Sequence, residues 1–264
     1  MKNNCLFKLL KTLIYPFLFG IGELIIAIIF SQIYSNNISK TFENDELFKA
    51  FLETSEYSDG LNTYMNEHLI YIILITLIIF LPLFIYKYRK YKIKTEFKLK
   101  SSIYLIIPSV CLAILLNLII INYNKLFGIT NILSDNNYLI ITLISSGIVG
   151  PILEEYLFRG IVYNELKTFN NEKVSMWLSI IIFALFHNTF SQMCYAFIIG
   201  YVLIKIYIKT HSLVYTSVFH MASNVIVSLL INSLISLNTI LSILLIVVLL
   251  IVFIFSYKFM YKKI

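Results

Sequence analysis

Long apolar runs dominate this sequence and restrict what it can fold into. A helix that crosses the hydrocarbon core of a bilayer needs about 20 consecutive apolar residues. The sequence holds eight such runs, separated by short polar segments, at roughly 12–34, 68–86, 102–122, 138–163, 174–190, 193–209, 212–233 and 238–257. We therefore expect an all-α protein, a polytopic bundle of about eight transmembrane helices.

The composition excludes a soluble globule with a single membrane anchor. Of the 264 residues, 59% are hydrophobic and 13% are charged, whereas soluble domains average about 25% charged residues. The net charge of +7 does not indicate a nucleic-acid partner, because the lysines lie between apolar runs, where membrane topology explains them. We expect contact with membrane lipids, in a bacterial cell membrane, since heavy use of Ile, Asn and Lys is typical of an AT-rich genome.

The distribution of basic residues predicts the orientation of the bundle. With a cytoplasmic N-terminus, the inner segments hold 17 of the 21 Lys and Arg residues and the outer segments hold three. Because cytoplasmic loops are enriched in Lys and Arg, both termini are expected in the cytoplasm. Segment 87–101 is then a basic inner loop that contacts anionic lipid. Segment 35–67 is an acidic outer loop with room for a short amphipathic helix.

The stretch IVGPILEEYLFRG, residues 148–160, places three ionisable side chains inside the fourth predicted span. Each such group costs roughly 3 kcal/mol at the centre of a bilayer, so it is a functional candidate by default. Glu155 and Arg159 are four residues apart and can pair on one face of a helix. Glu154 is turned about 100° away and is free to face a pocket.

Further polar residues are expected at a similar depth in the membrane. At 1.5 Å per residue from the cytoplasmic ends of the spans, the depths are ~15 Å for Glu154, ~20 Å for His187, ~12 Å for His220 and ~18 Å for Asn224. Hydrogen bonding between helices explains any one of these residues alone, but their agreement in depth favours one shared site. Glu23, in the first span, either lines that site or pairs with a neighbouring helix, and the structural role is favoured.

A carboxylate beside an imidazole can activate water. Glu154 would take the proton while His187 orients the water, and His220 with Asn224 would supply donors to an oxyanion. Hydrolysis of a peptide bond is the natural reaction for such a set. The alternative is that Glu154, His187 and His220 bind Zn²⁺, which lowers the pKa of bound water. Because Asn is a poor zinc ligand and no HExxH motif is present, metal-free chemistry is favoured.

Three polar motifs together are similar to those of a known family. They are Glu154-Glu155-x-x-x-Arg159, Phe183-x-x-x-His187 and His220-x-x-x-Asn224. In this order they resemble the signature motifs of the CPBP family, the type II CAAX prenyl proteases and bacteriocin-processing intramembrane endopeptidases. The resemblance covers about 138–235, and it divides the chain into a variable N-terminal membrane segment, 1–135, with three spans, and a core, 136–264, with spans four to eight.

The resemblance implies an intramembrane protease, of the glutamate type or the metalloprotease type, that cuts a membrane-associated peptide or protein. Glu154 would activate water with His187 as its partner. The remaining motif residues would support this pair: His220, Asn224, Glu155, Arg159 and Phe183. A non-catalytic bacteriocin self-immunity or scaffold protein with the same fold is the alternative. A proton-coupled transporter is disfavoured because no inverted repeat is evident.

Overall fold

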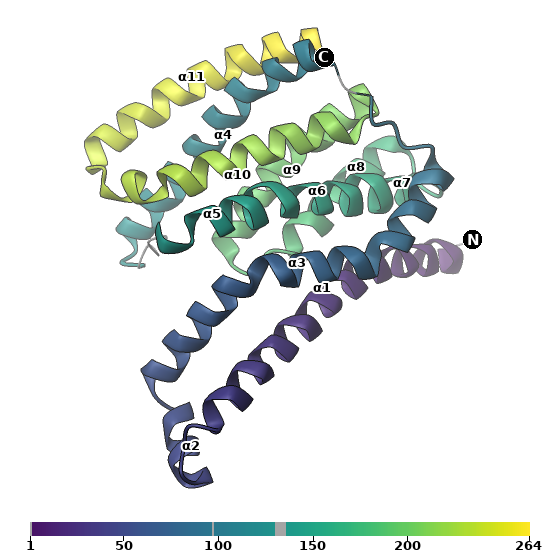
Figure 1. Ribbon diagram of the computed structural model, residues 1–264. Helices are drawn as coiled ribbons and strands as arrows, with labels where there is room; N and C mark the ends of the chain where they lie inside the picture. Colours follow the sequence, from purple (N-terminus) through teal and green to yellow (C-terminus); the bar gives the residue numbers. More distant parts are fainter. Residues whose placement is uncertain (1, 97, 130–135) are drawn as a thin grey trace.

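The computed structural model describes residues 2–96, 98–129 and 136–264, and these ranges are almost entirely helical (Figure 1). They contain no β-strand, only an isolated bridge between Lys94 and Ser212. The helical fold class is confirmed. The predicted division of the chain after residue 135 falls at the edge of segment 130–135, which lies outside the described residues.

The helices follow one another with short connections. In chain order they are α1 (Lys2–Ser39), α2 (Asp45–Leu52), α3 (Ser55–Tyr91), α4 (Leu99–Leu126), η1 (Asn136–Tyr138), α5 (Leu139–Thr142), η2 (Leu143–Val149), α6 (Gly150–Glu155), η3 (Tyr156–Tyr163), α7 (Asn164–Lys167), α8 (Glu172–Leu185), α9 (Phe190–Thr210), α10 (Leu213–Ser236) and α11 (Thr239–Lys263). From α5 to α7 the chain forms one continuous helix, Leu139–Lys167, which we call the central helix.

Seven helices of the described chain are long and apolar enough to cross a membrane. They correspond to all of the predicted spans except the fifth, 174–190. That segment forms α8, which has only 14 residues and a length of about 21 Å, against about 30 Å for a hydrocarbon core. The protein is therefore a multi-pass membrane protein in which one short helix accompanies seven long ones.

Helices α1 and α3 form a long antiparallel hairpin that leaves the bundle (Figure 1). They have 38 and 37 residues, about 57 Å at 1.5 Å per residue, so they exceed the thickness of a bilayer. Helix α2 lies at the tip, and its N-cap Asn44 accepts a hydrogen bond from the backbone of Leu47. The predicted amphipathic helix is confirmed, but most of the expected loop 35–67 is helix, because α1 and α3 continue beyond their apolar segments.

The central helix lies between the α1–α3 hairpin and α10, and both ends of the chain lie at the same end of the bundle (Figure 1). Helix α4 packs against both α10 and α11, and α4 and α11 lie on the far side of α10 from the hairpin (Figure 1). Helix α8 packs against α9. The side chains from Leu157 to Tyr163 are all buried. The second half of the central helix is therefore enclosed by the rest of the protein.

The central helix is not regular, because two π-helical segments, η2 and η3, flank the short α6. The N–H of Gly150 donates to the carbonyl of Ser145, five residues back. Pro151 has no N–H to donate, so the regular hydrogen-bond ladder is interrupted where the acidic pair begins. Short π-helical segments of this kind occur frequently at functional sites.

Candidate active site

A buried ion pair joins Glu155 to Arg159 on the central helix. The Nη1 of Arg159 lies 2.7 Å from the Oε1 of Glu155, and their side chains are 1% and 0% exposed. The Nη2 of Arg159 donates to the carbonyl of Gly200 on α9 at 3.3 Å, and the guanidinium lies 4.3 Å from the ring centre of Phe183 on α8. The predicted pairing is confirmed, and it also ties three helices together.

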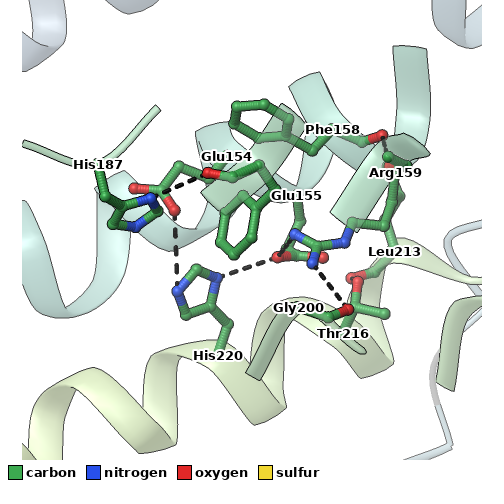
Figure 2. Close-up of polar contacts among 11 residues, drawn as sticks. Glu154, Glu155, Phe158, Arg159, His187, Gly200, Leu213, Thr216 and His220 are labelled. Atoms are coloured by element: carbon green, nitrogen blue, oxygen red, sulfur yellow. Dashed lines mark hydrogen bonds and ion pairs between the residues drawn. The ribbon is translucent and has the colours of Figure 1, made fainter. Parts of the chain in front are cut away.

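His220, on α10, lies between the two acidic residues (Figure 2). Its Nδ1 is 3.0 Å from the Oε1 of Glu155, and its Nε2 is 3.8 Å from the Oε2 of Glu154. A carboxylate is only an acceptor, so the Nδ1–H of His220 donates to Glu155. The Nε2 atom is thereby turned toward Glu154.

Glu154 lies at the edge of a cavity. Its side chain is 34% exposed, yet its Oε2 atom is buried and has no hydrogen-bond partner among the described residues. Glu154 therefore presents a carboxylate that is partly accessible and largely unpaired, whereas its neighbour Glu155 is fully enclosed. The two adjacent acids have the separate environments that their helical spacing predicts.

His187 lies in the turn between α8 and α9, and not within a span that continues to residue 190 as the sequence predicted. Helix α8 ends at Leu185, and a capping box between Thr189 and Gln192 starts α9. Such a box fixes the direction in which the chain enters a helix. The Nδ1 of His187 lies 3.0 Å from the carbonyl of Phe183, so this N–H donates and the Nε2 atom remains an acceptor.

Phe183 is the common neighbour of the charged and imidazole groups. Its ring meets the rings of His187 and His220 edge to face, with centroids 5.0 and 6.0 Å apart. Phe158 packs against it in the same manner at 5.0 Å. The sequence did not single out Phe158, and only its position four residues after Glu154, on the same helical face, pointed to the site.

Asn224 lies one helical turn beyond His220 on α10. Its amide donates to the carbonyl of Ser146 in η2 at 3.1 Å. The described contacts therefore tie Asn224 to the π-helical segment at the cavity wall and give it no hydrogen bond to Glu154. Of the four predicted catalytic residues, the structure brings His220 to Glu154, places His187 on the same cavity as Glu154, and places Asn224 farther along the helix.

A cavity of about 790 Å³ lies beside Glu154 and His187, which both line it. It is bounded by α1, by the central helix and by the turn between α8 and α9, and its wall is mostly apolar. Its polar lining residues are Glu23, Ser146, Glu154, His187, Asn188 and Gln192. Among the described residues of this wall there are two carboxylates and neither Lys nor Arg. Of the two alternatives left open for Glu23, the structure supports the place in the cavity.

The donor groups do not fit a zinc site with three protein ligands. In the described parts of the chain, no three His, Cys, Asp or Glu side chains lie together in a way that could hold a metal ion. We therefore derive no step through a metal.

Fold and site together define a multi-pass helical membrane protein with a buried carboxylate–imidazole cluster beside a cavity. Residues 136–226 match the model of the family described as type II CAAX prenyl endopeptidase Rce1-like, which is a protease family. The match confirms the resemblance to the CPBP family, and it includes all three motifs while covering less than half of the chain. Comparison with curated proteins and with solved structures gave no significant match.

Proposed function

We propose that this protein is an intramembrane endopeptidase in which Glu154 activates the attacking water. The observation that carries the proposal is that Glu154, whose Oε2 atom has no hydrogen bond among the described residues, lines a cavity that His187 also lines. A carboxylate in such a position is able to accept a proton from water, which is the first requirement of peptide hydrolysis.

In the proposed reaction, water lies in the cavity between Glu154 and His187. Glu154 accepts a proton from the water while the oxygen of the water attacks the carbonyl carbon of the peptide bond. The Nε2 atom of His187 accepts the second hydrogen bond of the water and fixes its orientation. Glu154 then returns the proton to the nitrogen of the leaving amine, so that the carboxylate is regenerated.

His220 and Asn224 have positioning roles in this proposal. His220 holds its Nε2 atom against Glu154 because its other nitrogen donates to Glu155. Asn224 fixes the π-helical segment η2 through the carbonyl of Ser146. The amide groups of Asn188 and Gln192 line the cavity and supply N–H donors for the oxyanion.

The lining of the cavity supports a particular class of substrate. Its wall is mainly apolar, with Glu23 and Glu154 as the charged groups of the described lining. An extended apolar segment of a membrane-associated peptide or protein fits this wall. A cationic side chain or a free amino group in that segment would be attracted to Glu23, which lines the cavity from α1.

The proposal is tested with the full chain reconstituted into liposomes together with a mixture of synthetic membrane-inserting peptides. New amino termini are labelled chemically and identified by mass spectrometry. We expect cleavage by the unchanged protein and a loss of about 100-fold or more in Glu154→Gln and His187→Ala, since each removes a group that handles the water.

Glu172→Gln is the matched control, because Glu172 is 55% exposed and forms only a surface ion pair with Lys167. It removes the same charge by the same chemical change as Glu154→Gln. Equal rates of cleavage in Glu154→Gln and in the control, at equal amounts of folded protein, would overturn the assignment of Glu154. Absence of any cleavage by the unchanged protein across peptides that differ in sequence and charge would favour the non-catalytic alternative.

A further inference from the structure

A second cavity lies where α1 begins and where α3 and the central helix end. It has a volume of about 360 Å³. Its charged lining residues are Lys8, Lys11, Lys87, Lys90 and Glu165. Four ammonium groups therefore face one carboxylate in a concave site between three elements, and none of the motif residues described above lines this site.

The single carboxylate is already engaged. Lys87, whose side chain is 4% exposed, forms an ion pair with the Oε1 atom of Glu165 and donates to the hydroxyl of Tyr15 at 2.7 Å. Lys90 lies 3.3 Å from the same Oε1 atom. The single negative charge of Glu165 thus balances one of the four lysines, and three positive charges of the cavity lining remain unbalanced.

Lys8 and Lys11 form no ion pair within the described parts of the chain. They are three residues apart on α1, so their side chains leave the same side of the helix. Like charges at this spacing repel each other. An anion in the cavity would relieve this repulsion and would complete the charge balance.

The surface beside the cavity is apolar. Phe7, Leu10 and Ile14 of α1 are 65%, 54% and 49% exposed, and they alternate along the helix with the two lysines. A phospholipid matches both features, because its negative headgroup can lie among the lysines while its acyl chains cover the neighbouring apolar surface. The basic residues at this end of the bundle also predict the cytoplasmic interface, where anionic headgroups are concentrated.

We propose that this cavity binds the phosphate group of an anionic phospholipid, whose acyl chains lie along α1. The phosphate would contact Lys8 and Lys11 and would be shared with Lys90. Bound in this way, one lipid joins α1 to α3, and the ion pair of Lys90 with Glu165 extends this link to the central helix. The lipid would hold α1, and with it Glu23, against the catalytic cavity.

The test uses the full chain in a neutral detergent and native mass spectrometry, with phosphatidylglycerol or phosphatidylcholine of identical acyl chains. We expect the unchanged protein to bind phosphatidylglycerol at least about tenfold more tightly, because each basic group near an anionic headgroup contributes severalfold to affinity. Lys8→Gln/Lys11→Gln should abolish this preference, and Lys8→Arg/Lys11→Arg should retain it. Both lysines are exposed, so these variants are expected to fold.

Lys262→Gln/Lys263→Gln is the matched control, since it removes the same charge from exposed positions at the end of α11. It should bind both lipids as the unchanged protein does. An equal loss of preference in the control and in Lys8→Gln/Lys11→Gln would overturn the proposal, as would an undiminished preference in the latter. Displacement of phosphatidylglycerol by millimolar inorganic phosphate would show a site for a soluble anion and would overturn the assignment to a lipid. None of these outcomes depends on proteolytic activity.

Discussion

The imidazole of His220 is oriented by Glu155, whose Oε1 atom lies 3.0 Å from its Nδ1. The same oxygen accepts the hydrogen bond from Arg159 at 2.7 Å. Glu155 therefore does more than neutralise a buried guanidinium. By accepting the hydrogen bond from Nδ1 of His220, Glu155 fixes the proton on that nitrogen and directs Nε2 toward Glu154. The buried Glu155 therefore determines which imidazole nitrogen lies beside the accessible Glu154.

Substitution of Glu155 should be strongly destabilising. In Glu155→Gln the guanidinium of Arg159 stays buried without an opposite charge beside it, and breaking a buried pair in this way costs about 3–5 kcal/mol. The free energy of unfolding, measured by circular dichroism during a denaturing-detergent titration, should fall by this amount. Glu172→Gln, which breaks the exposed pair with Lys167, should change it by less than about 1 kcal/mol. Similar effects of the two substitutions would contradict the assigned role of the buried pair.

The fourth span and its pairing were predictable from the sequence because both follow from local rules. The spacing of Glu155 and Arg159 places them on one face of any helix, and the cost of a buried charge requires that they pair. The contact between Glu155 and His220 joins positions 65 residues apart. Helical periodicity carries no information about how α10 is rotated against the central helix, so this contact required the structure.

The position of the turn between α8 and α9 was not predictable from the sequence, for a related reason. An apolar run of about 17 residues predicts a span, but hydropathy does not register that Thr189 and Gln192 form a capping box. Helix α8 ends at Leu185, and the box starts α9 at Phe190. His187 consequently lies in a turn at the cavity, where its position is fixed by the turn and by the carbonyl of Phe183.

Gly200 should not tolerate a side chain. A Cβ atom at this position would lie 2.9 Å from Cδ1 of Phe183 and 3.6 Å from Nη2 of Arg159. Because the ring of Phe183 is fully buried, we expect Gly200→Ala to lower the free energy of unfolding by about 1–3 kcal/mol. Gly20→Ala is the control, since its Cβ would meet Phe186 at an ordinary 3.6 Å and alanine favours a helix. If both variants have the same free energy of unfolding as the unchanged protein, the close packing of α8 on α9 at Gly200 does not contribute to stability.

Removal of metal ions should leave peptide cleavage intact. The described carboxylate, imidazole and thiol groups provide no set of three suitable for a metal ion, and the proposed reaction uses Glu154 as the base. Protein treated with a strong chelator and dialysed should retain its rate in the liposome assay and should contain far less than one zinc per chain by elemental analysis. Loss of cleavage on chelation, with recovery on addition of Zn²⁺ alone, would establish the metalloprotease alternative.

Glu23 should influence which peptides are cleaved rather than the chemical step. It lines the cavity from α1, so its carboxylate can pair with a cationic group of the substrate and contacts no reacting atom. In Glu23→Gln we expect KM to rise severalfold for peptides with a lysine near the cleaved bond, with little change in kcat, because uniform binding is lost. Peptides with norleucine in place of lysine should be unaffected. Glu67→Gln, on the exposed part of α3, should leave both peptides unchanged, and an equal loss of kcat for both peptides in Glu23→Gln would instead place Glu23 in the chemical step.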